Sequence, residues 1–146
     1  MAPLRSTAPE QFVTDFFTGF NDELALLDPD DDFTQLMERY YTRDIVQISD
    51  GVRLDWDRLL AHLPPVRKRL GGGTYRFDVQ EALADGDRIA ARLTLHVRDR
   101  KGRVIDMEIQ MIARFTPDGR MRGSHQLCRT LRDAKPSEQP SGPSAR

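Results

Sequence analysis

Cysteine is nearly absent from this chain, because Cys128 is the only one among 146 residues. A lone cysteine excludes an intramolecular disulfide, and no combination of Cys and His has the spacing of a metal site. The alternating residues around Cys128 indicate a strand, where an unpaired cysteine is more often a small buried side chain than a reactive thiol. We therefore expect no metal and no cofactor.

Long apolar runs and an excess of charge are also missing. No apolar stretch approaches 18 residues and no signal-peptide pattern opens the chain, so we expect a cytoplasmic protein without membrane contact. The formal net charge is −1, and the basic residues, mostly arginine, are spread along the chain. This argues against a nucleic-acid partner. The preference for arginine over lysine suits a GC-rich bacterial source.

The sequence does contain two long alternating segments, 87–98 and 104–115, joined by the turn 99–102. Alternation of apolar and polar residues predicts β-strands, here a hairpin with two different faces. The apolar face carries Leu93, Leu95, Met107 and Met111, with Phe115 at its end. An apolar sheet face of this length must be covered by the rest of the chain or by a ligand.

Helical periodicity is confined to the first half of the chain. Pro9 is well placed to begin a helix whose phenylalanines share one stripe, and a second helix is predicted over 33–41. A third begins after Asp55, and the pair Pro64 and Pro65 is expected to break it or to start a fresh turn. One strand is predicted over 43–51, between the second and third helices. Further strands are predicted over 74–83 and 121–131, with Gly-containing turns beside the strands.

This order, helices first and then a curved antiparallel sheet, predicts an α+β fold. The segments 1–8 and 134–146 contain little that could be buried and are rich in Pro and Ser, so we expect both to be disordered. The folded domain is predicted over 9–133. At this length a single core is sufficient.

Four segments of the sequence resemble the nuclear transport factor 2-like superfamily, and within it the SnoaL-like proteins of the polyketide cyclase and ketosteroid isomerase type. The segments are Tyr40-Tyr-Thr-Arg-Asp44 before a strand, Asp50-Gly51 before a helix, Asp85-Gly-Asp-Arg-Ile-Ala-Ala-Arg92, and Ile112-Ala-Arg-Phe-Thr-Pro-Asp-Gly-Arg-Met121. The resemblance implies a cone-shaped sheet wrapped by about three helices, with a pocket between helices and sheet. It also implies a homodimer formed through the convex sheet face.

His125 and Asp50 are the catalytic candidates. In the final strand His125 shares its parity with Met121, Leu127 and Leu131, which places its imidazole on the mostly apolar face as a possible acid or base. The matching position of SnoaL-like proteins is often Trp. Asp50 falls near the carboxylate base of the ketosteroid isomerase branch, although an Asp before Gly is more often only a turn residue.

The candidate ligand-binding residues are aromatic, sulfur-containing or amide side chains expected to line the pocket: Tyr40, Tyr41, Trp56, Met107, Met111, Phe115 and Gln126. Each could equally be part of the core. On the polar face of the hairpin, His96 should lie opposite Asp106 or Glu108. That pairing suits a salt-bridged outer face better than a catalytic dyad.

Two functions follow from these observations. The first is cofactor-free acid–base chemistry (isomerisation, cyclisation or epoxide opening) on a hydrophobic small molecule, in bacterial secondary metabolism. The second is a non-catalytic ligand-binding or dimeric interaction module, because no convincing acid–base pair lies on the apolar face. The fold alone does not choose between them.

Overall fold

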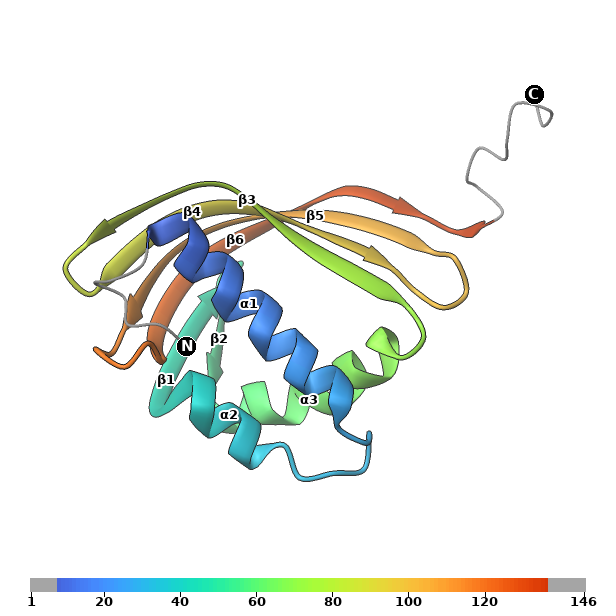
Figure 1. Cartoon of the computed structure of the whole chain (residues 1–146), viewed down its shortest axis with the longest axis horizontal. Coiled ribbons are helices and arrows are strands. Elements are labelled where there is room, and N and C mark those ends of the chain that lie inside the picture. The colour runs from blue at the N-terminus through green and yellow to red at the C-terminus, as the bar shows by residue number, and fades with distance from the viewer. Residues whose placement is uncertain (1–7, 137–146) are drawn as a thin grey trace.

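A computed structural model describes residues 8–136 of the chain, so most of the two terminal segments expected to be disordered lies outside the described residues. Three helices and six strands follow one another along the chain (Figure 1). The helices are α1 (Pro9–Leu26), α2 (Thr34–Tyr40) and α3 (Trp56–Leu70). The strands are β1 (Tyr41–Ser49), β2 (Val52–Asp55), β3 (Thr74–Asp85), β4 (Arg88–Arg98), β5 (Val104–Phe115) and β6 (Met121–Ala134).

The predicted α+β fold is confirmed. The six strands form one curved sheet in the order β2-β1-β6-β5-β4-β3, and the three helices lie on its concave side (Figure 1). The sheet is mixed rather than wholly antiparallel as predicted, because β1 and β6 run parallel while all other neighbouring strands are antiparallel. The short edge strand β2 was not expected, because Val52–Asp55 is too short and too polar to give a clear strand pattern.

Helix α3 differs from its prediction at the two prolines. It runs unbroken from Trp56 to Leu70 with Pro64 and Pro65 inside it. Its start is as expected, since the Asp55 carboxylate accepts a hydrogen bond from the Arg58 backbone N–H at 3.0 Å. Each proline removes one donor from the helix, but Ala61 and Pro65 are exposed, so water can reach carbonyls on this surface.

The core forms where α1 crosses the sheet. Phe12 and Phe16 on α1 pack edge-to-face against Phe115 at the end of β5, with ring centroids 4.9 and 5.4 Å apart. Ile89 and Leu93 of β4 are fully buried below them. We call the sheet surface that carries these residues the helix-facing side, and the opposite surface the outer side. The apolar stripe of α1 and the apolar face of the hairpin are therefore buried against each other, as their patterns predict.

A β-bulge near the start of β6 sets the direction of the side chains that follow it, as far as a second register shift at Leu131. Phe115 pairs with Met121, whereas Arg114 pairs with Gly123, so Arg122 has no partner on β5. One extra residue reverses the alternation. Met121 therefore faces the helices, but from Gly123 to Thr130 the parity is exchanged and Ser124, Gln126 and Cys128 take the helix-facing side. The shift at Leu131 restores the first parity, so Arg132 lies on the outer side.

Candidate functional site

The helix-facing side is closed at one end and partly open at the other. Under α1 the side chains of Ile89, Leu93 and Ala113 are at most 1% exposed. Farther along the same faces of β4, β5 and β6, Leu95, Met107 and Cys128 remain partly exposed. Any ligand site on this side therefore belongs to the open end.

Three polar side chains meet at this open end. The Gln126 side-chain amide on β6 donates to the Ser49 hydroxyl at the end of β1, with the two atoms 3.3 Å apart. The same nitrogen lies 3.9 Å from the Cys128 sulfur. Ser49 and Gln126 are register partners of the parallel pair, so the backbone fixes their proximity. We call Ser49, Gln126 and Cys128 the polar cluster.

Asp50 adds a carboxylate to the edge of the polar cluster. Its backbone N–H donates to the Gln126 carbonyl at 3.0 Å, and its Oδ1 accepts from the Cys128 backbone N–H at 2.9 Å. The residue has a positive φ of 51°, a conformation that Asp tolerates better than most residues. One carboxylate oxygen thus continues the β1–β6 ladder where β1 turns away. Oδ2 accepts no hydrogen bond from the described part of the chain.

The Cys128 thiol is protonated under ordinary conditions. Partial burial raises its pKa first, and the negative charge of Asp50 raises the pKa further. Hydrogen bonds from Ser49 and Gln126 act in the opposite direction but do not outweigh these effects. A thiol held in this form is a poor nucleophile. Its place in the polar cluster is that of a weak hydrogen-bonding group.

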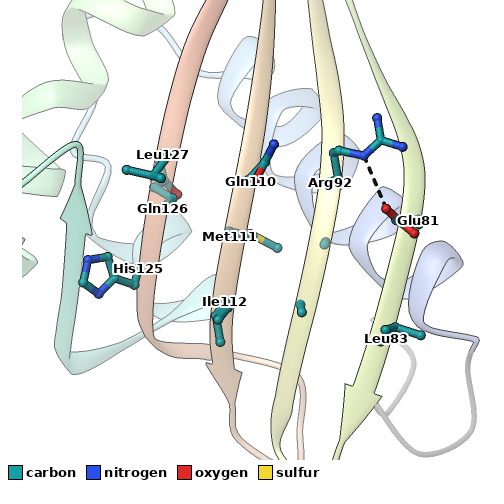
Figure 2. Close-up of a pocket in the computed structure, with 11 residues that line it drawn as sticks. Glu81, Leu83, Arg92, Gln110, Met111, Ile112, His125, Gln126 and Leu127 are labelled. Carbon is teal, nitrogen blue, oxygen red and sulfur yellow. Dashed lines mark hydrogen bonds and ion pairs between the residues drawn. The ribbon is translucent and has the colours of Figure 1, made fainter.

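The placement of His125 on the helix-facing side is wrong. Because of the bulge at Arg122, His125 pairs with Ile112 on the outer side and is exposed. Figure 2 shows its ring on the surface turned away from α1. Sequence parity counted from Met121 could not reveal this, since a bulge is defined by pairing with another strand.

The outer side around His125 holds a shallow hollow of about 490 Å³. Its apolar margin is unusual for a surface, because Leu83, Ile112 and Leu127 are 73%, 58% and 62% exposed. On the far strands, Arg92 pairs with Glu81 at 3.4 Å (Figure 2). The His125 ring therefore lies among exposed apolar side chains rather than in the interior.

Tyr40 and Tyr41 are both 8% exposed and belong to the core. The Tyr40 hydroxyl donates to the Glu23 carboxylate on α1, which directs it toward the surface. Burial and this hydrogen bond raise the pKa of Tyr40. Burial alone raises the pKa of Tyr41, whose ring packs between Phe16 and Phe20. Among the described residues, neither the Tyr40 nor the Tyr41 hydroxyl forms a hydrogen bond with a side chain of the polar cluster.

The remaining predicted binding residues divide by exposure. Met111 and Phe115 are 3% and 1% exposed, and both belong to the core. Met107 is partly exposed on the open end of the same face. Trp56 begins α3 and is 7% exposed, with the Arg43 guanidinium 4.5 Å from its ring centroid. Of these residues, only Met107 offers accessible surface beside the polar cluster.

His96 lies opposite Asp106, as predicted. Its Nδ1 is 2.7 Å from the Asp106 carboxylate, and its Nε2 is 3.0 Å from Asp78 on β3. Both ring nitrogens are therefore engaged on the outer side. This geometry agrees with the salt-bridged outer face that the sequence favoured.

Sequence reasoning predicted Asp50 and Gln126, and the structure brings these two together. It missed Ser49, and it missed that Cys128 lies beside Gln126. Only the parallel pairing of β1 with β6 brings Ser49 to these two residues. Among residues 8–136 no group of three or more His, Cys, Asp and Glu is arranged to hold a metal ion. None of the described helices is long and apolar enough to cross a membrane.

Comparison with known proteins gives a result only at the level of structure. No family model and no curated sequence matches the chain. Among solved structures, IdmH of Streptomyces antibioticus, for which polyketide cyclase activity has been suggested, superposes with a TM-score of 0.59 over 84% of this chain and 92% of its own, at 16% identity. The chain has the nuclear transport factor 2-like fold. The fold predicted from the sequence resemblance is thereby confirmed.

Two further structures with the nuclear transport factor 2-like fold differ in their described activities. An M. tuberculosis LEH-like epoxide hydrolase matches with a TM-score of 0.57 at 14% identity, over 82% of this chain and 81% of its own. A SnoaL-like protein of Shewanella denitrificans matches with a TM-score of 0.56 at 17% identity, over 82% of this chain and 88% of its own. The nuclear transport factor 2-like fold thus supports several chemistries, and the site must decide among them.

Proposed function

We propose that this protein is a SnoaL-like enzyme that removes a proton from carbon next to a carbonyl in a hydrophobic small molecule, without a cofactor. Asp50 is the base. Gln126 and Ser49 donate hydrogen bonds to the carbonyl oxygen, and Met107 contributes apolar contact. The observation that carries the proposal is the position of the Asp50 carboxylate beside the polar cluster, on the partly exposed end of the helix-facing side.

The proposed step needs one base and one or two neutral donors. The C–H proton passes to Oδ2 of Asp50, the oxygen that is not used by the Cys128 N–H. The C–H electron pair moves into the carbonyl group, which becomes an enolate. Donors preorganised toward the developing oxyanion stabilise such a species most effectively. Return of the proton to another carbon gives isomerisation. Attack of the enolate on a second carbonyl gives cyclisation, and the alkoxide formed there takes the proton held by Asp50.

Epoxide opening fits the site less well. It requires an acid that protonates the departing alkoxide as the ring opens. The thiol of Cys128 has a raised pKa and is a weak acid. The amide of Gln126 cannot exchange a proton in this way. The described residues of the polar cluster and the neighbouring Asp50 therefore support proton abstraction by a base better than epoxide opening.

A source in bacterial secondary metabolism is also part of this proposal. Its support is the similarity to IdmH of Streptomyces antibioticus, at the level of fold. The arginine-rich composition is compatible with it. A purified natural substrate would decide this point directly.

Exchange of carbon-bound hydrogen tests the proposal without knowledge of the natural substrate. The probe is 2-tetralone, an uncharged bicyclic ketone, incubated with the protein in heavy water and followed by proton NMR. We expect exchange above the buffer rate. Asp50→Asn keeps the acceptor for the Cys128 N–H but removes the base, so it should lower the enzymatic rate by about 10²-fold or more. Asp44→Asn, which removes an exposed carboxylate on β1 before Asp50, is the matched control.

A second candidate function is non-catalytic binding of the same class of ligand. It is favoured by the polar cluster itself, whose described groups are neutral and include no second strong acid or base. Trp56 is the only tryptophan, so its emission can report ligand binding. Saturable quenching by 2-tetralone without exchange would support this second function and reject the enzymatic one.

We propose in addition that a second copy of the chain covers the apolar part of the outer side around His125, away from the β4–β5 turn. The support is the exposed apolar margin formed by Leu83, Ile112 and Leu127, bordered by the Glu81–Arg92 ion pair. A two-fold axis can oppose like apolar surfaces and pair acid with base at their borders. Light scattering should give a dimer that Leu127→Asp converts to a monomer. Leu26→Asp, on exposed α1 surface, should leave it dimeric, and a monomeric parent protein would contradict the proposal.

A further inference from the structure

The outer side carries a second hollow, of about 440 Å³, at the end of the sheet near the β4–β5 turn. Its lining is different from that of the apolar hollow around His125. Three arginines, Arg76, Arg98 and Arg132, line it together with one carboxylate, Asp106. Arginine guanidinium groups bind phosphate oxygens through paired hydrogen bonds.

The acidic groups near this hollow are already engaged. Asp106 lies 2.7 Å from His96 Nδ1, and Asp78 binds both His96 and Arg76 at 3.0 Å. In contrast, within the described part of the chain neither Arg98 nor Arg132 forms an ion pair. Two exposed guanidinium groups thus line the hollow without a carboxylate partner.

The sheet fixes the spacing of these two arginines. Arg98 on β4 pairs with Val104 on β5, and Arg132 on β6 pairs with Asp106 on β5. Their backbones are therefore two strands apart and displaced by two residues along the strands, a separation of about 12 Å. Both side chains are long enough to reach one oxyanion between them, above the small buried side chain of Val104.

We propose that this hollow is a binding site for a phosphate group, held between Arg98 and Arg132. The group is either free phosphate or a phosphate monoester on an organic molecule, and the recognition chemistry is the same. Arg100 and Lys101 in the adjoining turn add positive potential at its margin. The site is separate from the proposed catalytic site, because it lies on the opposite side of the sheet.

Titration calorimetry with inorganic phosphate and with phenyl phosphate tests the site, using sodium chloride to hold the ionic strength constant. We expect saturable binding that Arg98→Gln and Arg132→Gln each weaken by about tenfold or more. Arg114→Gln, an exposed arginine at the other end of the outer side, is the matched control and should bind like the parent protein. Thermal unfolding checks that each variant is folded.

Binding of phenyl phosphate but not of inorganic phosphate would support the site and identify an organic phosphate as its ligand. Binding of both would support the shared phosphate chemistry. No saturable binding of either anion would overturn the proposal. Equal losses in Arg114→Gln and in Arg98→Gln would also overturn it, because they would indicate general charge attraction.

Discussion

A methyl group placed on Gly19 of α1 would lie 2.7 Å from the hydroxyl oxygen of Tyr40 at the end of α2. The Tyr40 hydroxyl cannot move away freely, because it donates to Glu23 one turn farther along α1. Glu23 in turn forms an ion pair with Arg39 at 2.8 Å. Gly19 therefore permits the close contact through which α2 is fastened to α1.

Gly19→Ala should destabilise the protein. Replacing a helix-interior glycine by alanine is normally favourable by about 0.5–1 kcal/mol, but overpacking of this kind costs about 1–3 kcal/mol. Urea unfolding should show a lower free energy of unfolding. In a Tyr40→Phe background the clashing oxygen is gone, and the same substitution should become neutral or favourable. Equal effects in both backgrounds would contradict this explanation.

His125→Ala should leave 2-tetralone exchange and the quenching of Trp56 emission unchanged. The imidazole lies on the outer side, and the sheet separates it from the polar cluster. Asp50→Asn in the same assays provides the positive control for loss. A large decrease in exchange caused by His125→Ala would show that the chemistry takes place on the outer side instead.

Thr116 should control the acid response of the β5–β6 turn. Its hydroxyl donates to the Asp118 carboxylate, and this hydrogen bond is the main reason that the pKa of Asp118 is lowered. A lowered folded pKa stabilises the fold above the unfolded value of about 4, and the contribution disappears as the pH falls through the folded pKa. Thr116→Val should therefore reduce stability at neutral pH more than at low pH.

Carbon-detected NMR titration of Asp118 measures this effect directly. The carboxyl pKa should rise toward its ordinary value in Thr116→Val. Thr116→Ser retains the hydroxyl and should keep the pKa low. If the valine variant titrates like the parent, the hydrogen bond is not the cause.

The Cys128 thiol should react slowly with 5,5′-dithiobis(2-nitrobenzoate) near pH 8. Its raised pKa keeps the thiolate fraction small, and the rate should keep rising beyond the ordinary cysteine pKa of about 8.5. Asp50→Asn removes a negative charge that raises this pKa, so the variant should react faster at pH 8. Unfolded protein gives the reference rate. A rate in the native parent equal to that reference would contradict the assignment.

Local sequence determined most of the secondary structure of this protein. The alternation in 87–98 and 104–115 is almost unbroken, and most of the residues that it predicted to be covered belong to the buried core. The pairing of His96 with Asp106 also follows from a hairpin register that the turn fixes. Patterns of this kind concern neighbours along the chain, and the sequence contains them directly.

The tertiary structure decided the candidate site. One unpaired residue, Arg122, reverses the parity of β6, turning His125 outward and Gln126 toward the helices. The parallel pairing of β1 with β6 then joins Ser49 and Asp50 to Gln126 and Cys128, nearly 80 residues later in the chain. A bulge and a parallel pairing are relations between distant strands. For that physical reason the sequence could predict the sheet, but not which of two adjacent residues, His125 or Gln126, faces the helices.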